Sequence, residues 1–287
     1  MSPALSQKQE YVQPTMRGVP LPKPGLVAQI VNSGTFSIAL YSLIIGAITY
    51  GAYTGAQAMG YNWQWYRVPQ YFYSFTDDGF QWGEIAYGLV QTLRISASAF
   101  VLATVLGVVV ALLRMSGLII CTGVAIGFLE LIRNIPLLVL LYLFYYVLGP
   151  IFGFDRYTAS VLCLGVFHSA LISEIFRAGI KAVATGQWEA ATSIGMSKAQ
   201  AYRYIIFPQS VRFMLPPMTG EVVQMVKSTA IVSVIAVAEL TTIGRNIISD
   251  TYMSFEIWFT IAAVYMALTL TLSIGVSFVE KRYAVSQ

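Results

Sequence analysis

The chain has 287 residues, of which 57% are hydrophobic and only 10% are charged, and its mean hydropathy is +0.68. Soluble domains carry about 25% charged residues, so this composition excludes an ordinary soluble enzyme and predicts an all-α integral membrane protein. The formal net charge of +4 is small. The lysines and arginines form no patch with base-reading chemistry, which excludes nucleic acid as a partner.

The apolar stretches predict about six transmembrane helices, and several of these stretches reach the roughly 20 residues that a spanning helix needs. A polar, proline-rich tail at residues 1–33 precedes the first of them. The long stretch 118–149 is interrupted at Asn134–Ile135–Pro136, which predicts a short interfacial helix before the break and the third span after it. No strand-like alternation stands out. The predicted spans are about 34–55, 84–113, 135–148, 157–180, 218–240 and 257–279.

Residues 56–83, between the first two predicted spans, are very rich in tryptophan, tyrosine and phenylalanine. Tryptophan and tyrosine prefer the boundary between membrane and water. This stretch is therefore expected to be an interfacial loop on the outer leaflet. The alternative is an aromatic surface for an external partner.

The distribution of basic residues predicts the orientation, because cytoplasmic loops carry an excess of lysine and arginine. With both termini inside, only Arg67, Arg156 and Arg245 of the flanking basic residues fall outside. The same assignment places the polar stretch 181–217 in the cytoplasm.

That polar stretch predicts a helix, a turn and a second helix. Residues 187–194 can form a short helix, and Gly195 permits a positive φ that ends it. Ser197 and Gln200 have the spacing of a capping box, which begins the second helix. Pro208, Pro216 and Pro217 are expected to stop the second helix. An ordinary surface hairpin between two spans would have the same pattern.

The spacing of this stretch resembles the EAA loop of permease subunits of ATP-binding-cassette importers, on which a separate ATPase subunit docks. Phe207 stands where that family usually has leucine. The residues that carry the resemblance are Glu189, Ala190, Ala191, Gly195, Ile205 and Pro208.

The resemblance extends from about Leu89 to the C-terminus and is strongest to polar amino acid permeases of the histidine, glutamine, glutamate and arginine type. It implies a type I importer permease core at 85–282 with a coupling loop at 181–217. The first span and the aromatic periplasmic loop, 34–84, are then an addition. The similar segments are 130–139, 174–180, 186–191, 216–221, 227–234 and 238–241.

The resemblance also implies the partners. They are ABC ATPase subunits, a second permease that is identical or homologous, and a periplasmic binding protein that delivers the amino acid to a bacterial inner membrane. The chain has no G-x-x-x-x-G-K-[ST] sequence, so ATP and Mg²⁺ are expected to bind the partner ATPase. No nucleophile and base stand at a catalytic spacing. The one histidine and the two cysteines, Cys121 and Cys163, are not spaced to bind a metal.

Ionisable residues inside spans usually face a bundle interior or a pathway. An amino acid needs an acceptor for its ammonium group, which Glu174 or Glu221 could supply. It also needs a donor for its carboxylate, which Lys227, Arg133 or His168 could supply. The alternative is that these side chains pair with one another to hold the bundle, as Glu174 and Arg177 would at i, i+3. The pathway candidates are Arg133, His168, Glu174, Glu221, Gln224, Lys227 and Ser228.

Three other functions are open at this point. An ion-gradient-driven secondary transporter usually has inverted repeats with paired broken helices, but only the break at Asn134–Pro136 is found. A membrane scaffold or sensor would dock partners without solute flux. An importer permease could also carry another small polar solute.

Overall fold

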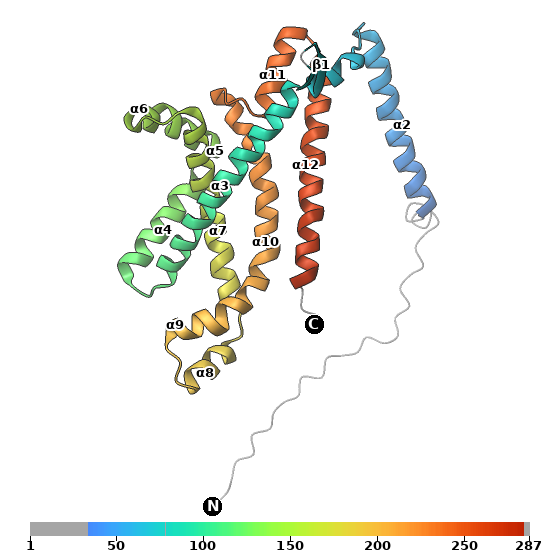
Figure 1. Ribbon diagram of the computed structural model, residues 1–287. Coiled ribbons are helices and arrows are strands. Elements are labelled where there is room, and N and C mark those ends of the chain that lie inside the picture. Colours follow the sequence, from blue (N-terminus) through green and yellow to red (C-terminus); the bar gives the residue numbers. More distant parts are fainter. Residues whose placement is uncertain (1–33, 78, 284–287) are drawn as a thin grey trace, which may run out of the picture. The chain divides into compact units, whose positions relative to one another are not determined.

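The computed structural model describes residues 34–77 and 79–283 (Figure 1). The polar tail predicted at 1–33 lies outside them. The chain divides into two units, Met1–Asn62 and Trp63–Gln287. In the first unit, helix α2 (Gly34–Ala58) is apolar along its whole length and has no buried residue, as befits a helix whose surroundings are lipid.

The second unit is organised around α3 (Glu84–Met115) and α7 (Arg156–Lys181), which confirm the second and fourth predicted spans. The two helices run in the same direction and approach closely at glycines. A Cβ at Gly107 would lie 2.6 Å from Ile172, and a Cβ at Gly165 would lie 2.6 Å from Leu102. Small residues allow such contact between membrane helices, so these glycines fix where the core forms.

The third span is bent. Helix α4 (Ile119–Asn134) meets α5 (Leu137–Tyr142) at an angle of 104°, and α5 continues through η2 (Leu143–Leu148) into α6 (Gly149–Phe152). The predicted break at Asn134–Pro136 is confirmed. Pro136 has no N–H to continue α4, and the Asn134 side chain donates to the Glu130 carbonyl at 2.7 Å.

The polar hairpin and the fifth span form one helical run. Helix α8 (Thr185–Ser193) is followed by α9 (Lys198–Ala201), η3 (Tyr202–Ile206) and α10 (Phe207–Ser228) without a loop after Lys198. A 3₁₀ segment, η4 (Thr229–Ile235), ends this run. After a 46° bend, α11 (Leu240–Thr251) begins, and α12 (Ser254–Tyr283) follows.

The prediction that three prolines stop the second helix of the hairpin is wrong. Pro208 follows η3 directly, at the second residue of α10, and the helical run continues through it. Pro216 and Pro217 lie inside α10, and Thr219 donates to the Pro216 carbonyl at 2.5 Å. Membrane helices tolerate interior prolines when side chains and neighbours satisfy the backbone groups that they free. The fifth span therefore begins well before residue 218.

The aromatic stretch contains a β-hairpin that the sequence analysis did not predict. Strand β1 (Tyr73–Thr76) pairs antiparallel with β2 (Gly79–Trp82), and the 3₁₀ helix η1 (Trp65–Tyr71) precedes them. Within the described residues, four helices are long and apolar enough to cross a membrane, and six spans result when each bent pair is taken as one. This agrees with the six predicted spans.

Candidate functional site

The loop between α7 and α10, which is predicted to couple to an ATPase, is a compact helical hairpin. Helix α8 ends in a Schellman motif, in which the Met196 N–H donates to the Ala191 carbonyl at 3.1 Å and the Gly195 N–H donates to the Thr192 carbonyl at 3.0 Å. Gly195 has φ +78°, the conformation that the sequence predicted for it. The turn thus satisfies the carbonyls at the end of α8 and reverses the chain.

The second arm of the hairpin begins with the predicted capping box. The Ser197 hydroxyl accepts from the Gln200 N–H at 3.3 Å, and the Gln200 side chain accepts from the Ser197 N–H at 2.8 Å. The arms are held together by an edge-to-face contact of Trp188 with Tyr202, whose ring centroids are 4.8 Å apart. The hairpin is therefore preorganised within this chain.

Side-chain exposure divides the six loop residues predicted to couple to an ATPase. Glu189, Ala190, Gly195 and Pro208 are exposed, and Ile205 is half-buried. Ala191 is only 1% exposed, so its small side chain serves packing inside the hairpin and is not available to another protein.

Two large apolar side chains on the same hairpin are exposed and were not predicted. Ile194 is 70% exposed and Tyr204 is 62% exposed. Figure 1 shows α8 and α9 at the end of the second unit away from the β-hairpin, projecting beyond the helices of the core. The hairpin thus offers exposed apolar side chains and exposed charges of both signs, Glu189, Lys198 and Arg203, clear of the bundle.

Among the pathway candidates, Glu174 is the centre of an ion cluster. Its carboxylate accepts from Arg177 at 2.6 and 2.9 Å and pairs with Arg114 from α3, and the Arg133 guanidinium from α4 lies 3.9 Å away. The predicted Glu174–Arg177 pair is present. One carboxylate thereby ties α3, α4 and α7 together.

His168 and Glu221 form a second, buried pair. The Nδ1 atom of His168 on α7 is hydrogen-bonded to the Glu221 carboxylate on α10, and the side chains are 3% and 4% exposed. His168 Nε2 has no hydrogen-bond partner among the described residues. The two side chains that the sequence offered as separate donor and acceptor for a substrate are engaged with each other.

Lys227 differs from the other candidate cations. It is exposed, and no carboxylate among the residues described pairs with it. Together with Gln224 it lines a pocket of about 360 Å³ between α10 and α12, where Ser273 and Ser277 add hydroxyl groups. Ser228, one residue on, donates to the Gln224 carbonyl at 2.9 Å.

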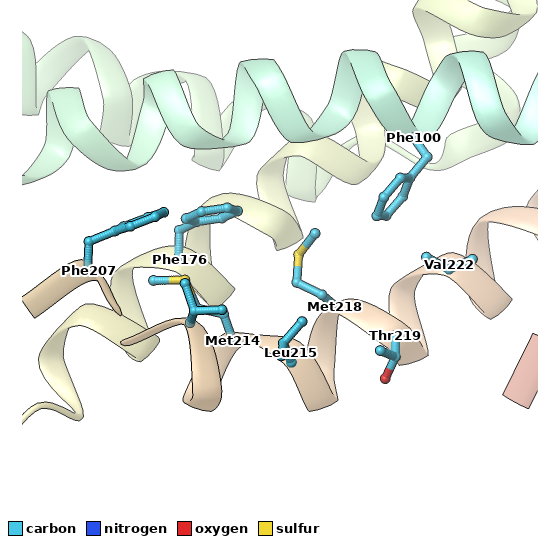
Figure 2. Close-up of a pocket in the computed structure, with 9 residues that line it drawn as sticks. Phe100, Phe176, Phe207, Met214, Leu215, Met218, Thr219 and Val222 are labelled. Carbon is cyan, nitrogen blue, oxygen red and sulfur yellow. The ribbon is translucent and has the colours of Figure 1, made fainter. Parts of the chain in front are cut away.

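A separate pocket of about 330 Å³ lies between α3, α7 and α10 and has an apolar lining. Figure 2 shows Phe100 of α3, Phe176 of α7 and Met218 of α10 directed into it. Aromatic and methionine side chains cannot compensate the charges of a zwitterion, so this pocket is unsuited to the charged groups of an amino acid.

Arg114 was not predicted as a member of the Glu174 cluster. The two residues are 60 positions apart. The only available signal was that Arg114 and Glu174 both lie toward the predicted cytoplasmic ends of their spans. No signal in the sequence distinguished the exposed Ile194 and Tyr204 from the other apolar residues of the loop.

The sequence matches known transport proteins. The family described as "Binding-protein-dependent transport system inner membrane component" matches residues 103–285. The "Probable glutamine ABC transporter permease protein GlnM" of Bacillus subtilis (strain 168) is 37% identical over 197 residues, which are 68% of this chain and 91% of that protein. The "Glutamine transport system permease protein GlnP" of Escherichia coli (strain K12) is 33% identical over 201 residues, 69% and 92% of the two chains.

Solved structures agree with these matches. An amino acid ABC transporter crystallised with histidines has a chain that is 42% identical, with a TM-score of 0.66 over 69% of this chain and 94% of that one. The inward-facing MetNI methionine ABC transporter is 18% identical with a TM-score of 0.63, covering 70% and 97%, and supports the fold alone. The chain belongs to the binding-protein-dependent transport system inner membrane components, the multi-pass permease subunits of ATP-binding-cassette importers.

Proposed function

We propose that this chain moves a polar L-amino acid across the bacterial inner membrane, driven by ATP hydrolysis in a separate subunit bound at the α8–α9 hairpin. The observation that carries the proposal is the hairpin itself. It is closed by its own Schellman motif and capping box, yet it exposes Glu189, Ile194 and Tyr204. A rigid projection with exposed apolar and charged groups suits a docking element.

The partners follow from the family. A permease of this kind works with ATPase subunits that bind ATP and Mg²⁺, with a second permease, identical or homologous, and with a periplasmic binding protein. The chain contains no Walker A sequence of its own. The coupling loop then lies in the cytoplasm with both termini, as the positive-inside rule predicts.

The cargo is proposed from the relatives and from one side chain. Two relatives are named for glutamine, and a similar transporter was crystallised with histidines. A polar amino acid has a carboxylate, and Lys227 is an exposed ammonium group without an acidic partner among the described side chains. Gln224, in the same pocket, adds an amide that can both donate and accept.

The remaining pathway candidates are assigned structural roles in this proposal. Glu174 is surrounded by arginines, and Glu221 is engaged with His168, so neither carboxylate is open to the ammonium group of a substrate. Family membership also disfavours the ion-gradient-driven alternative.

A pull-down tests the docking role. The tagged chain is solubilised in a mild detergent and compared with Glu189→Lys and with Asp250→Lys, an equal charge reversal at an exposed residue of α11. An ATPase is expected with the wild type and with Asp250→Lys, but not with Glu189→Lys. A second permease alongside it would distinguish a heterodimer from a homodimer. Absence of any ATPase from the wild type, in a detergent that preserves a known importer, would contradict the proposal.

A further inference from the structure

The β1–β2 hairpin presents an entirely aromatic face. Side chains alternate along a strand, and directly opposed residues share a face. The register pairs Tyr73 with Trp82 and Phe75 with Phe80, so these four rings lie on one side. They contact one another, with the centroids of Phe80 and Trp82 5.0 Å apart and those of Phe75 and Phe80 5.6 Å apart.

This face is exposed and uncharged. The four side chains are between 47% and 77% exposed, and neither strand contains a charged residue. The opposite face carries Ser74 and Gln81, which are paired with each other across the strands. An isolated two-stranded hairpin is marginally stable in water, so four exposed rings on so small an element indicate that another apolar phase covers them.

The hairpin is fixed to the first turn of α3. The Gly83 N–H donates to the Phe72 carbonyl at 2.8 Å, and a Cβ on Gly83 would lie 2.3 Å from the Tyr71 carbonyl group. Only glycine allows this approach. Because a strand rises about 3.3 Å per residue, Phe80 lies within about 13 Å of Glu84, where the membrane-spanning helix begins.

The preceding segment is attached to the first turns of α12. The Gln64 N–H donates to the Glu256 carboxylate at 2.6 Å, and the Trp63 ring lies 5.6 Å from that of Phe255. Val68 of η1 packs in one cluster with Ile85 of α3 and Ile257 of α12. The aromatic segment is thus held at the level where two spans begin, which is the boundary between membrane and water.

We propose that the aromatic face of the β1–β2 hairpin (Tyr73, Phe75, Phe80 and Trp82) lies in the headgroup region of the lipid bilayer and anchors the start of α3 at a fixed depth. Lipid is the occupant for two reasons. Neutral faces with tryptophan and tyrosine suit the interface, and the membrane-spanning helix α3, which begins two residues after β2, itself exposes Tyr87 and Val90 in its first turns. The hairpin also precedes the region 103–285 that the family model matches.

Nitroxide labels on the two faces test the proposal. Phe75→Cys and Gln81→Cys are made separately in a Cys121→Ala/Cys163→Ala background and reconstituted in phosphatidylethanolamine–phosphatidylglycerol vesicles. Collisions with oxygen, which concentrates in lipid, and with a water-soluble nickel chelate are measured by electron paramagnetic resonance. The oxygen-to-nickel ratio is expected to be several-fold higher at Phe75 than at Gln81.

Nickel accessibility at Phe75 that is as high as that of a label in water, with an oxygen-to-nickel ratio no higher than at Gln81, would place the face in water and overturn the proposal. Tyr73→Cys supplies a second site on the aromatic face if the Phe75 variant does not insert. A Tyr73 label that reports water would overturn the proposal in the same way.

Discussion

The buried pair of His168 and Glu221 gives the sharpest prediction, because it separates a structural role from a transport role. His168→Leu removes one partner and leaves a carboxylate that is 4% exposed without its hydrogen bond. Removing one partner of a buried, hydrogen-bonded pair leaves the other unsatisfied, which typically costs about 1–3 kcal/mol and more for a charged group. The double variant His168→Leu/Glu221→Met removes both polar groups at similar volume, and such replacements are often neutral or stabilising. The free energy of unfolding of the single variant should therefore fall by several times more than that of the double variant.

The assay is unfolding of the purified chain in mixed micelles by increasing mole fractions of sodium dodecyl sulfate, followed by tryptophan fluorescence. Uptake of radiolabelled amino acid by reconstituted vesicles is measured on the same variants. A structural pair predicts that the double variant regains both stability and uptake. The reasoning is refuted if the double variant loses as much stability as His168→Leu and Glu221→Met, measured separately, lose together. Restored stability with lost uptake would instead place the pair on the substrate pathway.

Four further predictions follow from single residues. A side chain at Gly195 would meet no atom within 4 Å but must adopt φ +78°, at a cost of about 1 kcal/mol. Gly195→Asp should therefore insert normally yet lose uptake, and Gly195→Asn is the uncharged control. Unchanged uptake by Gly195→Asp would argue against docking at the hairpin. Lys227→Gln should raise the KM for uptake at unchanged protein level, and an unaltered KM would exclude carboxylate binding there. Gly83→Ala forces a backbone shift at the base of the β-hairpin, which limited proteolysis near residue 77 should detect as faster cleavage than in wild type. The hydrogen bonds from Thr158 lower the pKa of Asp155 from its ordinary 3.8. The ionised Asp155 side chain therefore stabilises α7 fully above pH 3.8, and this stabilisation is lost as the pH falls through the lowered pKa. Asp155→Asn should remove this part of the acid sensitivity of thermal unfolding.

The spans and the hairpin turn could be predicted from the sequence because local physics determines them. The lengths of the apolar stretches predicted the bounds of α3, α7 and α12 to within a few residues. The break at Pro136 could be predicted without any tertiary information. Gly195 and the capping box are likewise local. The interior prolines of α10 were misjudged because proline is a strong helix breaker in water, whereas in a membrane bundle the helix is the only way to satisfy the backbone.

The pairings of the polar side chains could not be predicted, because they join distant positions. Glu174 was expected to pair with Arg177, one turn away, but its bond to Arg114 depends on how α3 and α7 align. The assignment of His168 to Glu221 depends on the contact of α7 with α10. The β-hairpin escaped notice for another reason. Its alternation of aromatic and polar residues lies in a stretch that is aromatic throughout, so the period of two did not stand out.

The uninterrupted helical run from Lys198 to Ser228 has a mechanical consequence. At about 1.5 Å per residue it is a strut of roughly 45 Å, with the capping box at one end and Gln224 and Lys227 near the other. Because no loop interrupts this helical run, a small rotation at its hairpin end would displace its far end directly. The run can bend at Pro216 and Pro217, where the two missing N–H groups leave fewer backbone hydrogen bonds. Force applied at the hairpin end of the run would therefore be expected to bend it at this proline pair.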